Sequence, residues 1–188
     1  MAGFRVHITG ASGSGVTTFG RALAQARSCP SFDTDDFYWL PTDPPYAEKR
    51  PVPQRLQLMS ELFLSRPDWV LSGSLDGWGD PLIPCFDAVI FVTLEPEERM
   101  RRLAAREARR YGAAALQPGG REHAGHKAFM AWAARYDDSG FAGRCRARHE
   151  AWLSALPCPV VTVESTEPVE DMLRRVEHAL TPRERISA

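Results

Sequence analysis

Residues 10–17 read GASGSGVT, and this stretch limits the possible folds more than any other part of the chain. It lies between an apolar run that favours a strand and a stretch that favours a helix. Two glycines separated by four residues, followed by one residue and a threonine, have the spacing of a phosphate-binding P-loop. In that motif a lysine stands between Gly15 and Thr17, whereas this chain has Val16, which carries no charge.

The spacing predicts a phosphate site even without the lysine, because a P-loop binds mainly through its backbone. Successive N–H groups form a nest for an anion, and the following helix adds the positive end of its dipole. β-Branched residues begin a helix poorly, which suggests that Val16 and its neighbours serve a ligand, and Val16 should then point toward the phosphates. The alternative is a Gly/Ser-rich turn without a ligand. The residues expected at the phosphates are Gly10, Ser12, Gly13, Ser14, Gly15, Val16, Thr17 and Thr18.

Short apolar runs alternate with helical stretches along the whole chain. Strands are expected at 4–9, 30–35, 69–75, 86–94 and 160–164, and helices at 16–28, 54–64, 96–111, 123–137, 144–156 and 168–180. Such alternation predicts a parallel sheet covered by helices on both faces. For 188 residues we therefore expect one domain over 1–188, an α/β three-layer sandwich with a five-stranded parallel sheet.

The composition limits the classes of partner that this chain is expected to have. No apolar run approaches the ~18 residues of a membrane span, and the beginning of the sequence lacks a signal-peptide pattern. The four cysteines are dispersed, as expected in a reducing cytoplasm. The net charge of −1 makes nucleic acid an unexpected partner. The chain holds 21 arginines but only two lysines, Lys49 and Lys127, so few lysines could replace the missing one.

The helix expected at 96–111 is rich in arginine. Met100, Leu103, Ala104, Ala108 and Tyr111 recur at helical spacing and should face the core. Glutamates three or four residues earlier can form ion pairs with arginines; the expected pairs are Glu95–Arg99, Glu97–Arg101, Glu98–Arg102 and Glu107–Arg110. Arg106 and Arg109 have no acidic residue at that spacing, so we expect them to bind a polyanion. The alternative is a solvated arginine face.

Two acidic stretches follow expected strands. Asp33 and Asp35 come where α/β sheets bind ligands, and they could hold Mg²⁺ or accept a proton from a hydroxyl. An acidic turn is an equally good interpretation, and Asp76 in the SGSLDGWGD segment has the same two interpretations. His123 and His126 lack the partners of a metal site, and Phe129, Trp132, Ala133 and Tyr136 suggest a core stripe. Arg144 and His149 could face the same cleft.

These motifs together resemble the P-loop nucleoside-monophosphate kinases and shikimate-kinase-like phosphotransferases. The likeness is greatest to bacterial adenylate-kinase-related proteins, some of which are described as DNA topology modulators. The resemblance implies ATP and Mg²⁺ as cofactors, a lid at about 111–126 and an acceptor-binding segment at about 36–64. It also implies the following roles: Asp33, Asp35, Arg106 and Arg109 in catalysis, Arg102 at the nucleotide, Lys49, Arg50 and Asp76 at the acceptor, and Thr17 and Asp35 at the metal.

Two functions remain open from the sequence. One is an ATP-dependent phosphotransferase acting on a small molecule, a nucleotide or a nucleoside-like acceptor, in which an arginine takes over part of the role of the lysine. The other is a nucleotide-binding regulator, of the topology-modulating kind, that lost efficient transfer when Val16 replaced the lysine. The acidic and basic residues retained in the motifs favour the enzyme.

Overall fold

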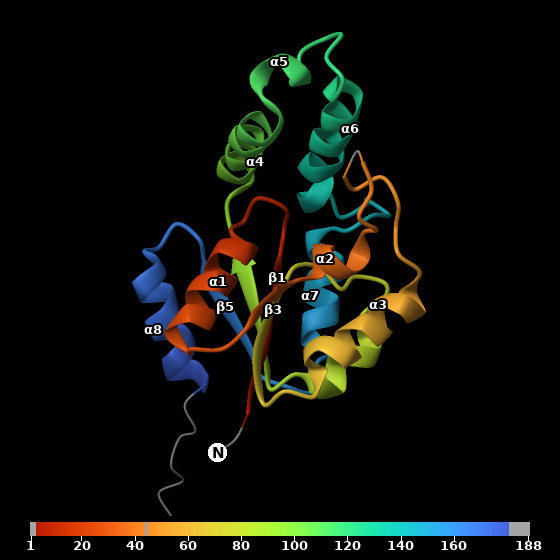
Figure 1. The fold of residues 1–188 in the computed structure, drawn as a ribbon. Coiled ribbons are helices and arrows are strands. Elements are labelled where there is room, and N and C mark those ends of the chain that lie inside the picture. Colours follow the sequence, from red (N-terminus) through yellow and green to blue (C-terminus); the bar gives the residue numbers. More distant parts are fainter. Residues whose placement is uncertain (1–2, 44, 181–188) are drawn as a thin grey trace, which may run out of the picture.

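The computed structural model describes residues 3–43 and 45–180. Five strands form one parallel sheet in the order β2-β3-β1-β4-β5, with helices on both faces (Figure 1). The strands are β1 (Phe4–Gly10), β2 (Ser31–Asp33), β3 (Asp68–Ser72), β4 (Ala88–Thr93) and β5 (Val160–Glu164). This confirms the predicted α/β three-layer sandwich with a five-stranded parallel sheet.

The helices are α1 (Val16–Ala26), α2 (Thr34–Tyr38), α3 (Val52–Met59), α4 (Pro96–Tyr111), α5 (Ala113–Leu116), α6 (His123–Ala134), α7 (Arg146–Ser154) and α8 (Val169–Leu180). All six expected helices are present, α4 with the expected bounds and the others with shifted ends, and α3 continues into a π-helical turn at Ser60–Leu64. Short α2, short α5 and a 3₁₀ turn at Asp80–Cys85 were not expected. The strand expected at 30–35 ends early because Asp33 caps α2, accepting a hydrogen bond from the backbone N–H of Asp35 at 3.0 Å.

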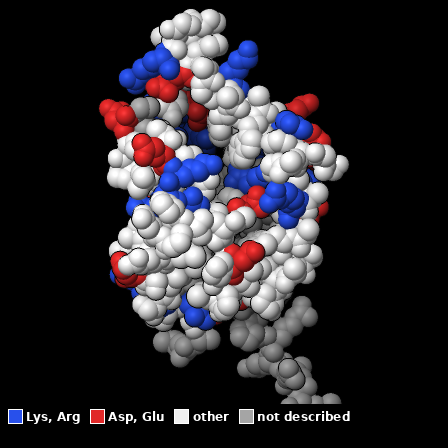
Figure 2. Space-filling model, turned by 90° about the vertical axis from the view of Figure 1, so that its right-hand side faces the viewer, with Lys and Arg blue, Asp and Glu red and all other residues white. Residues whose placement is uncertain are grey.

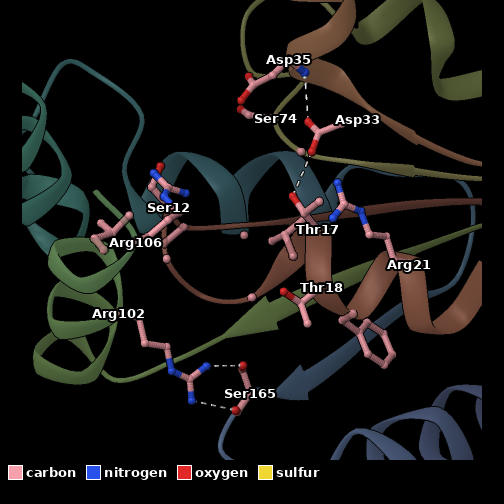
Figure 3. Close-up of a pocket in the computed structure, with 18 of the residues that line it drawn as sticks. Ser12, Thr17, Thr18, Arg21, Asp33, Asp35, Ser74, Arg102, Arg106 and Ser165 are labelled. Atoms are coloured by element: carbon pink, nitrogen blue, oxygen red, sulfur yellow. Dashed lines mark hydrogen bonds between the residues drawn. The ribbon is translucent and has the colours of Figure 1, made fainter. Parts of the chain in front are cut away.

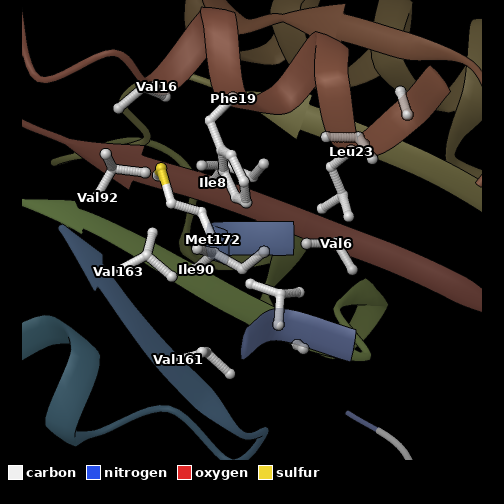
Figure 4. Close-up of a cluster of buried hydrophobic side chains, with 14 residues drawn as sticks. Val6, Ile8, Val16, Phe19, Leu23, Ile90, Val92, Val161, Val163 and Met172 are labelled. Carbon is white, nitrogen blue, oxygen red and sulfur yellow. The ribbon is translucent and has the colours of Figure 1, made fainter. Parts of the chain in front are cut away.

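Two apolar clusters hold the layers together. On one face of the sheet, α1 and α8 pack on alternate residues of the strands, among them Ile8, Ile90 and Val163 (Figure 4). On the other face, α2, α3 and α7 cover strand residues whose side chains point to that side of the sheet, such as Leu71 and Val89. The central strands are therefore buried on both sides, as a parallel sheet requires.

Strand β1 alternates apolar and polar residues in its sequence, but it is buried on both faces from Val6 onward. His7 faces the second cluster, is fully buried, stacks on Phe86 and contacts the carbonyl oxygen of Leu71 through Nδ1 at 3.0 Å. Burial lowers the pKa of His7 to about 4. The imidazole is thus a neutral core residue at neutral pH.

Helices α4, α5 and α6 extend beyond the sheet as a hairpin (Figure 1). The buried stripe of α4 is Arg99, Leu103 and Glu107, whereas Ala104 and Ala108 are exposed, so the expected apolar face was wrong apart from Leu103 and the half-buried ends. Among the described residues, no helix is long and apolar enough to cross a membrane.

Arg99 makes none of the ion pair expected with Glu95. Its side chain is 1% exposed and donates to the carbonyl oxygen of Ala133 and to the carboxylate of Asp137, both at 2.9 Å. These partners lie at the end of α6 and in the turn after it, so this arginine joins α4 to α6. Spacing within one helix could not reveal partners 34 and 38 residues away.

Candidate functional site

The glycine-rich loop follows β1, the central strand, at the carboxyl edge of the sheet. Gly13 and Gly15 have φ angles of +86° and +94°, which residues with a side chain rarely adopt. A Cβ atom on Gly15 would lie 2.8 Å from Ser165 Oγ, and one on Gly13 would lie 2.7 Å from the carbonyl oxygen of Arg99. Helix α1 begins directly after Gly15, so its unpaired N–H groups face the loop. This is the geometry of an anion nest.

A chain of hydrogen bonds connects the loop to the acidic segment after β2 (Figure 3). Thr17 Oγ1 donates to Asp33 Oδ2 at 3.0 Å, and Asp33 Oδ1 accepts from the N–H of Asp35. Both carboxylate oxygens of Asp33 are therefore occupied, while the Asp35 carboxylate lies beside Ser74 (Figure 3). Burial and the charge of Asp33 raise the pKa of Asp35, and the charges of Arg144 and Arg106 oppose this rise.

A cavity of about 1020 Å³ surrounds the loop, and we call it the donor cavity. The predicted residues that line it are Gly10, Ser12, Gly13, Gly15, Val16, Thr17, Thr18, Asp33, Asp35, Arg102, Arg106 and Arg109. Ser14 is the exception, because its fully buried hydroxyl donates back to the carbonyl oxygen of Ala11. Ser14 can thus contribute its backbone only.

Val16 does not present its side chain to the cavity as expected. It is 9% exposed and belongs to the apolar cluster with Phe19, Val92 and Met172 (Figure 4). The residue still lines the donor cavity. The physical reason is that a branched apolar side chain at the start of α1 gains more from burial under the loop than from contact with water.

The expected Glu98–Arg102 ion pair of α4 is confirmed, whereas Arg101 pairs with Glu98 and not with Glu97. Arg101 and Arg102 both bind Glu98, and Arg102 also donates to the hydroxyl and carbonyl oxygens of Ser165. Arg106 binds its neighbour Glu107 at 3.2 Å, a partner that a search at helical spacing overlooks.

The ends of the arginine series face the cavities. Arg109 is exposed and lines the donor cavity. Arg110 lies over the ring of Tyr46 at 5.1 Å, and Figure 2 shows Lys and Arg side chains gathered around a hollow of the surface.

A second cavity of about 690 Å³ adjoins the first, and we call it the acceptor cavity. Its aromatic lining comes from the segment after α2, the loop after β3, the end of α4, and α6; these residues are Tyr38, Trp39, Tyr46, Trp78, Tyr111, Phe129 and Trp132. The predicted core stripe of α6 is therefore divided, because Ala133 and Tyr136 are buried whereas Phe129 and Trp132 line this cavity.

The expected acceptor residues have different surroundings. Lys49 lines the acceptor cavity, with its ammonium 5.7 Å from the Tyr38 ring centre. Asp76 lines it too and pairs with Arg148 at 2.9 Å. Arg50 lines neither cavity and donates to the carbonyl oxygens of Phe37 and Trp39. Backbone groups therefore engage part of its guanidinium, and its contact with an anionic acceptor stays a prediction.

Seven residues line both cavities: Ser12, Asp35, Tyr46, Ser74, Arg106, Arg110 and Arg144. Of these, Ser74 and Tyr46 gave no usable signal in the sequence, since their roles depend on the sheet order and the fold of the 36–64 segment. His149, expected near Arg144, instead contacts the Tyr136 hydroxyl at 2.9 Å in the core. His123 contacts the carbonyl oxygen of Leu116 at 2.9 Å.

Magnesium fits the oxygen donors beside the loop. Among the described residues, no three His, Cys, Asp or Glu side chains form a group suited to a metal. Mg²⁺ commonly uses one or two protein oxygens and completes its shell with water and substrate phosphates. Thr17 and Asp33 supply such oxygens, and Asp35 lies on the same side of the cavity.

Comparison with known proteins agrees with this geometry. The sequence profile of a family described as AAA domain (AAA_18) matches residues 6–122. An uncharacterized protein of Bacillus subtilis (strain 168), YqaC, is 39% identical over 171 residues, which cover 91% of this chain and 94% of that protein.

Solved structures share the fold at low sequence identity. Shikimate kinase from Bacteroides thetaiotaomicron is 16% identical, with a TM-score of 0.54 over 95% of this chain and 99% of that one. Shikimate kinase from Acinetobacter baumannii, solved with shikimate, is 14% identical, with a TM-score of 0.55 over 97% and 95%. A gluconokinase from Sinorhizobium meliloti 1021 is 17% identical, with a TM-score of 0.50 over 95% and 92%. The chain therefore has a P-loop kinase-like fold.

Proposed function

The chain belongs to the AAA_18 family of AAA domains, and from that premise we propose that it is an ATP-dependent phosphotransferase whose acceptor carries a hydroxyl group and a planar ring. The observation that carries this proposal is the junction of the two cavities at Ser12, Asp35 and Arg144. A phosphoryl group held by the loop would face the acceptor cavity there. Catalysis of this kind consists mainly of positioning and charge stabilisation.

The transfer step uses Asp35 as its base. The acceptor hydroxyl gives its proton to the Asp35 carboxylate while its oxygen forms a bond to the γ-phosphorus of ATP. The bond from that phosphorus to the bridging oxygen breaks, and ADP leaves with the electron pair. Asp35 suits this role better than Asp33, because the Asp33 oxygens already accept hydrogen bonds from Thr17 and from the N–H of Asp35 and keep only their remaining lone pairs, which suffice for a metal ion. Mg²⁺ bound at Thr17 and Asp33 would neutralise phosphate charge.

The lining of the acceptor cavity supports a ring-bearing acceptor. It contains three of the five tryptophans and three of the four tyrosines of the chain. Aromatic faces favour stacking with planar groups. In nucleic-acid sites such stacking contributes ~1–3 kcal/mol of binding free energy per base. A nucleoside-like compound fits these rings better than an acyclic polyol does.

Transfer and binding measurements test the proposal together. ADP release with ATP and Mg²⁺ is measured against nucleosides and against polyols such as gluconate. We expect transfer to a ring compound, loss of transfer in Asp35→Asn with nucleotide affinity retained, and loss of ATP binding in Gly15→Val, whose side chain would meet Ser165.

The alternative function, a nucleotide-binding regulator, leads to a different expected result. It would bind ATP, transfer to none of the compounds, and show the same slow hydrolysis in Asp35→Asn as in the wild type. That outcome would replace the phosphotransferase proposal.

A further inference from the structure

We propose that Arg144 supplies the cation that a lysine supplies in other P-loops. This inference rests on the proposed function, since it concerns the same ATP site. The need for such a group follows from Val16, whose side chain is buried in the apolar cluster and leaves the loop without a charge of its own.

Arg144 reaches the loop from a distant part of the sequence. Its Nη2 donates to Ser12 Oγ at 2.5 Å, across 132 residues of chain. Arg144 and Ser12 both line the donor and the acceptor cavities, so the guanidinium lies where the two meet. A transferring phosphoryl group must pass through that junction.

The surroundings hold this guanidinium in place. It lies over the ring of Trp132 on α6, 5.0 Å from the ring centre. The next residue, Cys145, is 1% exposed and fixes the backbone at the start of α7. A charge fixed before the substrate arrives needs little reorganisation when phosphate charge develops.

The guanidinium also keeps capacity for a ligand. Its Nε is buried and has no hydrogen-bond partner among the described residues. The carboxylates of Asp35 and Asp76 interact with Arg144 through charge, and neither forms a direct ion pair with it. A phosphate group in the cavities that Arg144 lines would supply the charged partner that this nearly buried guanidinium lacks among the described residues.

The other cations near the loop are less suited. Lys49 lines only the acceptor cavity, and Lys127 is exposed and lines neither cavity. Arg102 is occupied by Glu98 and Ser165. Arg106 lines both cavities as well, but its side chain is 43% exposed and paired with Glu107, so it is less fixed than Arg144.

Nucleotide binding tests the role of Arg144 without knowledge of the acceptor. Calorimetry with ATP and with ADP, both with Mg²⁺, is carried out on the wild type, Arg144→Ala and Arg144→Gln. Arg135→Ala serves as the control, because Arg135 is an exposed arginine of the preceding turn, paired with Asp138. We expect Arg144→Ala to weaken ATP binding about 10- to 100-fold and ADP binding much less, with an intermediate loss in Arg144→Gln and none in Arg135→Ala.

A double-mutant cycle with Val16→Lys gives the second readout. If Arg144 fills the place of the lysine, Val16→Lys should restore ATP affinity at least tenfold in Arg144→Ala and improve it less in the wild type. Equal gains in both backgrounds, or equal ATP affinity of Arg144→Ala and Arg135→Ala, would overturn the inference.

Two controls separate the possible failures. Melting temperatures show whether each variant is folded, and Arg144→Gln, which keeps a donor for Ser12, covers a failure of Arg144→Ala to fold. Absence of ATP binding in the wild type would contradict the proposed function itself. ATP binding that is unaffected by either Arg144 substitution would contradict only this inference.

Discussion

At the scale of single residues, the arginines of α4 differ more than their spacing suggests. Arg99 is buried and joins two helices, whereas Arg101 is 75% exposed in its side chain and binds only Glu98. The sequence predicted the same ion-pair role for both. Their surroundings distinguish them, because breaking a buried ion pair lowers the stability of the fold far more than breaking an exposed one.

Alanine substitutions should show this difference in stability. Arg99→Ala removes charge-assisted hydrogen bonds to Asp137 and Ala133, and we expect it to lower the free energy of unfolding by about 3 kcal/mol. Arg101→Ala should lower it by about 0.5 kcal/mol or less. Urea denaturation of the two variants measures both values, and equal losses would contradict the burial argument.

Asp35 offers a prediction on the pH dependence of transfer. A base acts when deprotonated, so activity falls as the pH drops through its pKa. The charge of Arg144 lowers the pKa of Asp35, and Arg144→Ala should therefore move the acid limb of the pH–rate profile to higher pH. Arg101→Ala should leave the limb in place, and an unmoved limb in Arg144→Ala would show that another group is the base.

At the scale of elements, the sequence predicted all five strands and the six longer helices. Periodicity succeeded for α1, α3, α7 and α8 because each of these helices buries one face against the sheet. It failed on α4, where the buried stripe of Arg99, Leu103 and Glu107 faces another helix and contains two charged residues. It also gave no signal for α2, five residues long and begun by the Asp33 cap.

The same limit applies to the site. The loop, Asp33 and Asp35 were predictable because local spacing defines them. The position of Arg144 on the loop depends on how α6 and α7 fold back over 132 residues. The surroundings of Arg50 were equally out of reach of the sequence, since its Nε donates to the carbonyl oxygen of Phe37 and the side chain lines neither cavity.

The hairpin of α4 and α6 leads to a prediction on rates. Arg106 lines both cavities, whereas Arg109 and Arg101 line only the donor cavity, where Arg101 is held by Glu98. We expect Arg106→Ala to slow phosphoryl transfer the most, by ~10³ if it contacts the transferring group, with a smaller loss in Arg109→Ala and little change in Arg101→Ala. Single-turnover kinetics give these rates, and identical behaviour of the three variants would remove α4 from the catalytic site.

At the scale of the whole molecule, the sheet connects a rigid apolar body to the cavities at its carboxyl edge. Two buried histidines lie in this body, His7 on β1 and His149 on α7. Burial is the main cause that lowers the pKa of His7 to about 4 and that of His149 to about 3. Both are neutral in the folded protein at neutral pH. The stability of the fold therefore depends on these two imidazoles remaining unprotonated.

Acid should therefore destabilise the fold before the site carboxylates titrate fully. Between a pKa of about 6.5 in the unfolded chain and about 4 in the folded one, the unfolded state binds a proton at His7 that the folded state does not. Stability then rises with pH across that window and is lost as the pH falls, by about 1.4 kcal/mol per pH unit for each such histidine. His7→Leu removes one titrating group while keeping the contacts with Phe86, so the slope of unfolding free energy against pH between 6 and 4.5 should decrease by about that amount. Urea denaturation at several pH values measures the slope, and equal slopes in the wild type and His7→Leu would mean that His7 is protonated in the folded protein.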